Sequence, residues 1–385
     1  MSIKRQIVEQ LLMYKEKFPI LAITGPRQSG KTTMLKNLFP DYAYVNLENP
    51  DNRFFAEDDP NGFLETYSDK VILDEVQHVP FLFSYLQDLV DNSGKMGQFI
   101  LSGSQNFHLM ANITQSLAGR VAIFKLMPFD FQELEDAGLL NDDYAVNMIR
   151  GFYPAIYQRD ILSRVYYDNY IQTYIERDVS TITKVKDLKA FRNFISLCAG
   201  RAGQILSLNA LANECDISQP TAKSWLSVLE TSFVVFLLQP YHKNYNKRII
   251  KSPKLYFYDS GLLSHLLRVK DPVKIKNDSL KGNIFENMIV SEYVKQNYHL
   301  GHQHEFYFWR DSDGHEVDLL RISDDGIEAI EIKATETVMP DLFKGLNYFE
   351  RISNEEKLWR KTLLYAGKDN QKRTAGYVVS WRDLK

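Results

Sequence analysis

The chain has 385 residues, 44% of them hydrophobic and 25% charged, and a formal net charge of −3 at pH 7. The length favours two or three domains over one core, and the slightly negative charge argues against a protein that coats nucleic acid along its whole surface, so such a partner must be met by a local basic patch. The two cysteines, Cys198 and Cys215, give no disulfide framework, and the longest apolar run (233–238) is too short to span a bilayer, so we expect a reducing, cytoplasmic location and no membrane partner.

A phosphate-binding loop is predicted near the N-terminus. The run ILAIT (20–24) is typical of a buried strand, GPRQSGKTT (25–33) follows at once, and MLKNLF (34–39) continues as a helix. The pattern G-x-x-x-x-G-K-[ST] therefore has the context that it requires, and a plain glycine turn is the alternative. Backbone N–H groups of such a loop bind phosphate, Lys31 reaches the β- and γ-phosphates of ATP, and Thr32 binds Mg²⁺. The predicted nucleotide-binding residues are Gly25, Pro26, Arg27, Gln28, Ser29, Gly30, Lys31, Thr32 and Thr33.

An apolar strand that ends in two acids supplies the second half of the site. KVILDEVQ (70–77) places Asp74 and Glu75 directly after its apolar residues. We expect Asp74 to hold the Mg²⁺ shell and Glu75 to orient or deprotonate the attacking water. A strand that merely ends in two solvated acids is the alternative. Together with the loop, the two acids predict hydrolysis of ATP and not binding alone.

A third strand-like segment, QFILSGSQ (98–105), ends in small polar residues that can sense the γ-phosphate. Ser104 is our candidate for this sensor, with Ser102 and Gln105 close by. In the following segment SLAGRVAIFKLMPFDFQEL (116–134), Arg120 stands between a predicted helix and the next strand. We interpret Arg120 either as an arginine finger, acting in cis or from a neighbouring subunit of a homo-oligomer, or as a plain surface arginine.

The middle of the chain is predicted to be helical. Residues 151–200 show apolar and aromatic residues at three- and four-residue spacing, which favours a connecting helical layer. The segment 206–230 then predicts a helix, a tight turn and a second helix, with Ser207 capping the first and Ser218 and Pro220 opening the second. The exposed positions early in the second helix would be Thr221, Lys223 and Ser224. Contact with DNA and packing against protein both stay open for this helix pair.

A basic stretch follows the helix pair. YHKNYNKRIIKSPK (241–254) contains no acid, and two tyrosines, Tyr241 and Tyr245, are interleaved with its basic residues. These basic residues are Lys243, Lys247, Arg248, Lys251 and Lys254. Such a composition suits a wing that contacts a nucleic-acid backbone, with salt-dependent affinity. A solvated surface is the alternative.

The hairpin HEVDLLRISDDGIEAIEIKA (315–334) collects charge on one face. If Ile322 pairs with Ile327, antiparallel register places Asp318 opposite Glu331 and Glu316 opposite Lys333. Because like charges across a ladder are destabilising, the two acids need a cation between them. Lys333 is one candidate, and a hard divalent ion such as Mg²⁺ or Mn²⁺ is the other.

The elements around this hairpin resemble the restriction-endonuclease-like fold of the PD-(D/E)xK superfamily. An amphipathic helix with Glu286 (281–296) and a strand (305–309) precede the hairpin, while helix-like 341–352 and strand-like 361–367 follow. The resemblance implies that Glu286, Asp318 and Glu331 bind a metal ion and that Lys333 positions or activates water. Val317 stands where the superfamily name has proline. An inert scaffold with a salt-bridge cluster is the alternative.

As a whole, the chain resembles bacterial and archaeal AAA-type ATPases that carry a C-terminal domain of unknown function. The resemblance rests on GPRQSGKTT, ILDEVQ, LSGSQ, LAGRV, LMPFDFQEL, KLYFYDSGLL and the hairpin, taken in order. It implies ATP hydrolysis on a parallel-sheet core, followed by a helical segment, a winged helix and a nuclease-like domain.

These observations predict an α/β protein with three modules. They are a P-loop ATPase domain (1–150), a helical connector with a winged helix-turn-helix (151–260), and a restriction-endonuclease-like domain (261–385). We predict Mg²⁺-dependent ATP hydrolysis coupled to the binding or processing of nucleic acid, with DNA as a partner and metal-dependent nuclease activity at the C-terminal site. The alternative is an ATP-controlled switch that binds DNA or protein and carries an inert nuclease-like scaffold.

Overall fold

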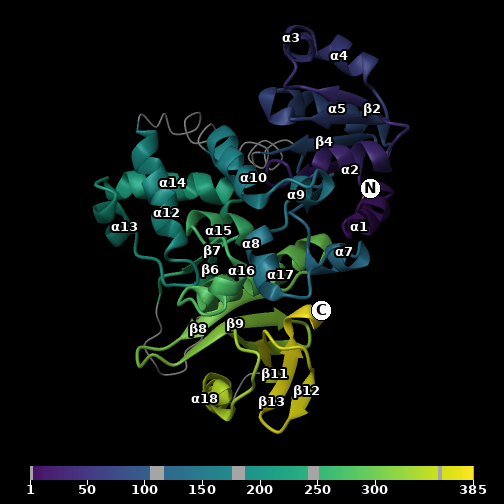
Figure 1. Ribbon diagram of the computed structural model, residues 1–385. Helices are drawn as coiled ribbons and strands as arrows, with labels where there is room; N and C mark the ends of the chain where they lie inside the picture. The colour runs from purple at the N-terminus through teal and green to yellow at the C-terminus, as the bar shows by residue number, and fades with distance from the viewer. Residues whose placement is uncertain (1–2, 105–116, 176–186, 242–250, 354–357, 385) are drawn as a thin grey trace.

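The computed structural model describes residues 3–104, 117–175, 187–241, 251–353 and 358–384 (Figure 1). The N-terminal unit (purple to blue), a group of helices (teal) and a large sheet (green to yellow) follow one another along the chain. The predicted α/β fold class is confirmed, because a parallel sheet is followed by a helical module and a mixed sheet. Among the helices within these ranges, none combines the length and the apolar character that a membrane span requires.

The N-terminal unit is built on a five-stranded parallel sheet with the order β2-β3-β4-β1-β5. Its strands are β1 (Ile20–Thr24), β2 (Ala43–Asn46), β3 (Val71–Asp74), β4 (Phe99–Gly103) and β5 (Val121–Lys125). Strands β1, β3 and β4 are buried at every position, which explains their uninterrupted apolar sequences. Because the strands are parallel, the segments that follow β1, β3 and β4 meet at one edge of the sheet.

Helices cover both faces of this sheet. They are α1 (Val8–Lys15), α2 (Lys31–Leu38), α3 (Pro50–Asp58), α4 (Pro60–Thr66), the 3₁₀ turn η1 (Val76–His78) and α5 (Leu82–Ser93). Alternate residues of β1 point to opposite faces, so Leu21 packs with α1 and α2 while Ala22 packs with α3, α4 and α5. The N-terminal unit therefore has three layers.

The helical module follows β5. It comprises α7 (Phe131–Asp136), α8 (Tyr144–Arg150), α9 (Pro154–Gln158), α10 (Ser163–Tyr170), the π-helical turn η2 (Ile171–Ile175), α12 (Leu188–Ala199), α13 (Leu208–Glu214), α14 (Gln219–Thr231), α15 (Ser260–Leu266) and α16 (Pro272–Ile275). The predicted helix pair 206–230 is confirmed as α13 and α14. Both predicted caps are also confirmed, since Ser207 accepts from the backbone N–H of Ala210 and Ser218 from that of Thr221.

The second sheet has eight strands in the order β12-β13-β11-β10-β9-β8-β6-β7. They are β6 (Val235–Pro240), β7 (Lys254–Phe257), β8 (Glu305–Arg310), β9 (Glu316–Ser323), β10 (Gly326–Lys333), β11 (Leu358–Tyr365), β12 (Gln371–Arg373) and β13 (Gly376–Ser380). Strand β6 pairs with β8 and with β7, so the two strands on either side of the basic stretch form one edge of this sheet. The predicted module boundary at residue 260 lies just after β7. The hairpin register is confirmed, because Ile322 faces Ile327.

One face of this sheet packs on α17 (Lys281–His299), and the other packs on η3 (Pro340–Phe343) and α18 (Lys344–Ile352). The short turn η4 (Trp381–Asp383) ends the described chain. Helix α17 lies between the N-terminal unit and the second sheet (Figure 1). It is buried around most of its circumference, so the prediction of an amphipathic helix with one solvated face is wrong.

Gly151 joins α8 to the following helix at a point where two backbones touch. Its φ is +72°, and a Cβ atom there would lie 1.9 Å from the Tyr167 hydroxyl oxygen and 2.9 Å from the Cα atom of Gly261. Gly138 has a similar φ of +68°, but nothing lies within 4 Å of its Cβ position. Gly151 also has a ψ of −169°, so a side chain there meets both steric overlap and a backbone conformation that is essentially restricted to glycine.

We expect Gly138→Ala to lower the free energy of unfolding by about 1–2 kcal/mol through backbone strain. Gly151→Ala should lower it by a further 1–3 kcal/mol or so, because overpacking adds to the strain. Chemical denaturation of both variants measures the difference. Equal losses would show that Tyr167 and Gly261 yield to the new methyl group without cost.

Candidate functional site

The loop between β1 and α2 uses glycine where another residue would not fit. Gly25 has a φ of +149°, and a Cβ atom there would lie 2.1 Å from the carbonyl oxygen of Leu126. Gly30 has a φ of +92° and directly precedes the first residue of α2, Lys31. The chain can therefore turn tightly and begin the helix against the loop, and the N-terminus of a helix favours anions.

Lys31 is buried against its own loop. Its Nζ atom donates hydrogen bonds to the carbonyl oxygens of Gly25 at 2.9 Å and Pro26 at 2.8 Å. Burial lowers the pKa of this ammonium to about 8, although Glu75 and Asp74 oppose the shift. A desolvated ammonium gains from a nearby anion, so Lys31 has the environment of a phosphate ligand.

Thr32 and Asp74 come from different elements and meet at the predicted Mg²⁺ position. The Thr32 hydroxyl, in the first turn of α2, donates to Oδ2 of Asp74, the last residue of β3, at 2.7 Å. The Tyr44 hydroxyl donates to the same oxygen at 2.7 Å. Burial and the hydrogen bond to Asp74 raise the pKa of Tyr44, so the phenol stays protonated and remains a donor. The oxygen donors of Thr32 and Asp74 are of the type that Mg²⁺ prefers.

Glu75 and Ser104 are also brought together. Oε2 of Glu75 accepts from the Ser104 hydroxyl at 3.1 Å and from the Gln77 side-chain amide. The backbone of Glu75 is left-handed, with a φ of +53°, a conformation that costs a non-glycine residue about 1–2 kcal/mol. Strain of this kind is frequent at functional sites, where the surrounding structure holds a side chain in a required direction.

Several buried hydroxyls surround the loop without a hydrogen-bond partner. Within the described ranges, the side-chain oxygens of Thr24, Ser29 and Ser102 are fully enclosed and unpaired. These three residues lie at the end of β1, within the loop and in β4. Buried polar groups are normally satisfied, so these oxygens fit a site that a polyanion and its metal ion would complete.

The outer part of the loop meets the helical module. The Gln28 side-chain amide donates to the Tyr174 hydroxyl at 2.5 Å, and the Arg27 guanidinium lies 5.7 Å from the centre of the Tyr174 ring. A pocket of about 190 Å³ adjoins Gly30, and Thr33 lines it from α2. Further lining residues are Ile3, Arg5, Phe129 and Pro154.

Arg120 does not reach this site. It directly precedes β5, whose first residue pairs with the first residue of β1, so Arg120 lies at the amino edge of the sheet. The loop follows Thr24 at the carboxyl edge of the sheet. The four residue steps from Ile20 to Thr24, at about 3.3 Å each, separate the two edges by roughly 13 Å. Arg120 instead forms a bidentate ion pair with Asp91, at 2.5 and 2.7 Å. An arginine finger acting in cis is therefore wrong for Arg120.

Parts of the other predictions fall outside the described residues, namely Gln105 and most of the basic stretch, with Lys243, Tyr245, Lys247 and Arg248. Lys251 is exposed. Tyr241 and Lys254 are both buried, so the prediction that they contribute to a nucleic-acid-binding surface is wrong. On α14, Lys223 and Ser224 are exposed as predicted, whereas Thr221 is partly buried and hydrogen-bonds to Ser218 at 2.8 Å.

Lys333 supplies the cation between the hairpin acids. Its Nζ atom lies 3.1 Å from Oδ2 of Asp318 and 2.6 Å from Oε1 of Glu331. Burial opposes ionisation of Asp318, but Lys333, Lys254 and the backbone N–H of Ile332 together lower its pKa. Burial and the nearby Asp318 raise the pKa of Glu331 to about 8. Burial and repulsion thus weaken the ionisation of Glu331, and Lys333 compensates the negative charge of the pair.

Glu286 belongs to a second group centred on Lys254. The Nζ atom of Lys254 lies 3.2 Å from Oε1 of Glu286 and also pairs with Glu316, while the Tyr256 hydroxyl donates to Glu286 at 2.6 Å. Burial alone would lower the pKa of Lys254, yet Glu286, Asp318 and Glu316 raise it. The ammonium thus stays charged although its side chain is only 3% exposed.

The predicted metal ligands Glu286, Asp318 and Glu331 do not form one compact site. Among the described residues, the three-residue groups whose ligand atoms all lie within 4.8 Å of one another are Asp130–Glu133–His299 and Asp311–Asp313–His315. The three predicted ligands are instead divided between two lysines, Lys333 and Lys254. A pocket of about 660 Å³ adjoins Glu316, Glu331 and Lys333, and Oε2 of Glu331 has no hydrogen-bond partner within the described chain.

Sequence reasoning missed Tyr44, Gln77 and Tyr256, and it assigned Lys254 to the basic surface instead of to Glu286. Gln77 lies only two residues after Glu75, so its contact with Glu75 could have been predicted from the sequence. Lys254 and Tyr256 alternate on one face of β7, but their acidic partner, Glu286, lies about thirty residues further on in α17. Nothing local in the sequence identifies that partner.

Three family models match consecutive parts of the chain. Residues 17–135 match an AAA domain, residues 141–273 a domain of unknown function (DUF8612), and residues 281–384 another domain of unknown function (DUF4143). The AAA match covers the five-stranded sheet with its loop, Asp74, Glu75 and Ser104. The N-terminal unit therefore has a P-loop fold and is similar to AAA domains, which supports ATP hydrolysis.

Curated relatives extend over most of the chain. The uncharacterized protein Rv2008c of Mycobacterium tuberculosis is 29% identical over 344 residues, which cover 87% of this chain and 74% of that protein. An uncharacterized protein of Haemophilus influenzae is 20% identical over 328 residues, which cover 77% of this chain and 79% of that protein.

Two solved structures show weaker likeness. A Walker-type ATPase of Pyrococcus abyssi has a TM-score of 0.43 and 13% identity, and the match covers 69% of this chain and 96% of that one. AMPPCP-bound DnaA from Aquifex aeolicus has a TM-score of 0.26 and 15% identity, with 58% and 86% covered. Neither likeness bears on function.

Proposed function

We propose that this protein hydrolyses ATP with Mg²⁺ and that Lys31, Thr32, Asp74, Glu75 and Ser104 carry the reaction. The observation that carries this proposal is the hydrogen bond between Thr32 and Asp74, because it joins the helix after the phosphate loop to the acidic end of β3. A glycine turn and a solvated strand end would give no reason for this contact.

Each residue has a distinct task in the proposed reaction. Lys31 binds the β- and γ-phosphates, and the loop backbone from Gly25 to Gly30 donates N–H groups to them. Thr32 and Asp74 hold Mg²⁺, which neutralises developing charge on the phosphates. Glu75 accepts a proton from the attacking water or orients it, and Ser104 donates to Glu75 and so fixes the direction of its carboxylate.

We infer that the base of the nucleotide binds beside Gly30. The pocket lined by Ile3, Arg5 and Phe129 adjoins the start of α2 and offers both apolar and polar surface. We infer that adenine occupies it. We also infer a cytoplasmic location, which the two free, buried cysteines support. In a homo-oligomer, Arg120 could act as an arginine finger at the ATP site of a neighbouring subunit, once its ion pair with Asp91 is broken.

We expect Lys31→Ala to abolish ATP binding, because it removes the cation that neutralises the phosphates. Glu75→Gln should retain binding and lose turnover by at least about a hundredfold, the usual contribution of a general base. Calorimetric titration and phosphate release measure both effects. Glu65→Gln, an exposed acid of α4, is the matched control and should behave as wild type. Undiminished hydrolysis by Glu75→Gln would remove Glu75 from the mechanism.

We further infer that ATP turnover is coupled to nucleic-acid binding through the exposed start of α14. Lys223 and Ser224 are exposed there, and the helix begins at a capped Ser218, as in a helix that approaches a phosphate backbone. The exposed Lys251 lies on the chain that leads into β7 and is a second candidate for a phosphate contact.

Replacing Lys223 and Lys251 with alanine should weaken DNA binding and flatten its salt dependence by roughly one unit of slope per lost phosphate contact. Fluorescence anisotropy with a DNA duplex, measured at several salt concentrations, tests this expectation. Lys189→Ala, an exposed lysine of α12, serves as the control. Identical affinity and slope in all proteins would assign these lysines to a solvated surface.

For the C-terminal half, we infer a structural role for the charge cluster. Lys333 and Lys254 compensate its acids, so the cluster needs no metal ion to be stable. Metal-dependent cleavage of nucleic acid is the second candidate. The 660 Å³ pocket beside Glu331 and the unpaired Oε2 atom of that residue favour it.

Asp318→Asn distinguishes these two candidates. If the cluster is structural, the change leaves Lys333 under-compensated, so the protein should unfold at a lower temperature and show no Mn²⁺ binding before or after the change. If the cluster binds metal, wild type should take up Mn²⁺ and cut plasmid DNA, and both properties should be lost together.

The ATP site also binds divalent ions, so all proteins in this titration carry Lys31→Ala and Asp74→Ala. Asp324→Asn, at the exposed turn of the same hairpin, is the matched control and should change neither property. Saturable Mn²⁺ binding that Asp318→Asn removes would overturn the structural role.

A further inference from the structure

Helix α17 contacts the segment that follows β5 through three buried ionisable side chains, Glu292, Lys295 and His299. Glu292 accepts from the backbone N–H of Phe131 at 2.7 Å, and Lys295 donates to the carbonyl oxygen of Phe129 at 2.7 Å. Their spacing of three and four residues places them on one side of the helix. The segment 126–133 thus lies between the parallel sheet of the ATPase unit and the helix that supports the C-terminal sheet.

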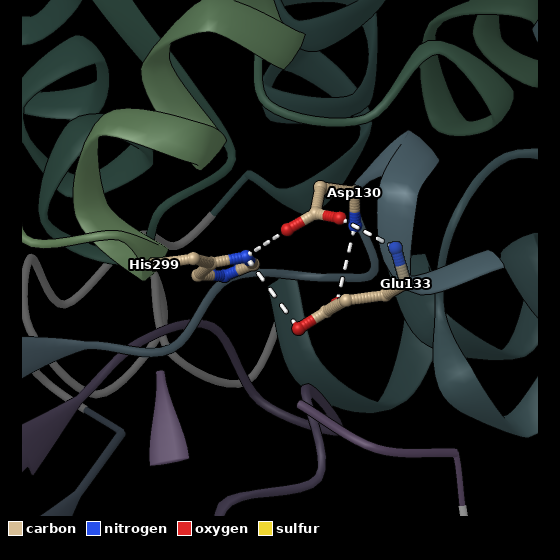
Figure 2. Close-up of side chains that lie close together, drawn as sticks. All are labelled: Asp130, Glu133 and His299. Carbon is tan, nitrogen blue, oxygen red and sulfur yellow. Dashed lines mark hydrogen bonds and ion pairs between the residues drawn. The ribbon is translucent and has the colours of Figure 1, made fainter. Parts of the chain in front are cut away.

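His299 ends this row within a compact cluster (Figure 2). The Nδ1 atom of His299 lies 2.6 Å from Oδ2 of Asp130 and 3.7 Å from Oε1 of Glu133. The Nε2 atom of His299 accepts from the backbone N–H of Met127 at 3.1 Å, so Nδ1 carries the proton and donates to Asp130. Burial opposes ionisation of Asp130, but the hydrogen bond from His299 is a main cause of its lowered pKa.

The cluster is suited to joining chain segments and not to holding a metal ion. Asp130 also caps α7 by accepting from the backbone N–H of Glu133 at 2.8 Å, and Oε1 of Glu133 accepts from Nε of Arg5 and from the backbone N–H of Gln6, each at 2.9 Å. With Nε2 of His299 also occupied, the ligand atoms already serve hydrogen bonds. An incoming ion would have to break several of them.

Arg5 continues the chain of contacts into the phosphate loop. Its Nη1 atom donates to the carbonyl oxygen of Ser29 at 2.8 Å, and its Nη2 atom donates to that of Met127 at 2.6 Å. Ser29 lies two residues before Lys31, and Arg5 itself lines the pocket beside Gly30. One planar guanidinium therefore joins the loop, the segment after β5 and Glu133, a geometry that lysine cannot reproduce.

We propose that Arg5 is a positioning residue for the phosphate loop and that its position depends, through Glu133 and Asp130, on His299 of helix α17. This inference rests on the proposed ATPase function and names the part of the protein that regulates that site. By reciprocity, nucleotide binding at the loop would bias the placement of α17, and movement of α17 would change nucleotide affinity by the same factor.

The test measures the affinity of the full chain for Mg²⁺ and a non-hydrolysable ATP analogue by calorimetry, together with KM and kcat for ATP. Arg5→Lys and His299→Ala should each weaken binding and raise KM about tenfold, within the usual range of coupling between sites. Since both act on one chain of contacts, the double variant should be no weaker than the weaker single variant.

Asp130→Asn is a second variant, in case His299→Ala does not fold. Its amide oxygen can still cap α7, while its NH₂ group faces the N–H of His299, so chiefly the link to α17 is lost. Binding should again weaken about tenfold. Met288→Ala is the matched control, because it removes buried packing from α17 away from the cluster. It should lower the unfolding temperature without changing nucleotide affinity.

Three results would overturn the inference. The first is wild-type affinity and KM in His299→Ala or Asp130→Asn, with only the unfolding temperature lowered, as in Met288→Ala. The second is full additivity in the double variant. The third is an absence of nucleotide binding by wild type, which removes the proposed function as well. Binding of the analogue without ATP turnover would remove the hydrolytic function alone and leave the coupling intact.

Discussion

The compensation of buried charge along α17 is the constraint on which the rest of the structure depends. Glu292, Lys295 and His299 are fully buried, and burial without partners would cost several kcal/mol for an ionised Glu292 or Lys295. Burial raises the pKa of Glu292 to about 7, even though Lys295 lies 2.8 Å away and opposes the shift. Apart from Gln296 of the same helix, their remaining partners come from the segment after β5, so these groups are satisfied where the ATPase unit meets α17. The relation between the two halves is thereby fixed by polar groups as well as by apolar packing.

The phosphate loop has a different origin, because its geometry follows from adjacent residues. Gly25 and Gly30 permit the turn, a buried strand precedes it and a helix follows it, so most of the loop's shape can be understood from the segment 20–38 alone. The contact with Asp74 needs only that β3 lies in the same parallel sheet as β1, with β4 between them. Arg5 is the exception, since it reaches the loop from before α1 and depends on Glu133 for its direction.

This difference explains how much could be predicted from the sequence. The strand–loop–helix motif, the capped helix pair and the register of the hairpin depend on local pattern, and the structure confirms them. The face of α17 could not be predicted, because its surroundings come from both sheets and the helix has no solvated side. Arg120 was interpreted from its neighbours in sequence, whereas its position at the amino edge follows from the pairing of β5 with β1. Errors therefore concentrate where partners are distant in the chain.

The hairpin acids show most clearly that partners distant in the chain cannot be predicted from the sequence. Opposed acids on a ladder require a cation, and the sequence alone supports that conclusion equally for a lysine and for a metal ion. Lys333 is adjacent and could be considered, but Lys254 enters from β7, more than sixty residues before Asp318. Lys254 changes the charge balance of the cluster, because two ammonium groups now meet these acids while the pKa of Glu331 is raised to about 8. A divalent ion that bound Oδ2 of Asp318 would have to displace the half-buried Lys333, and its binding would then include the cost of separating that lysine from its partner.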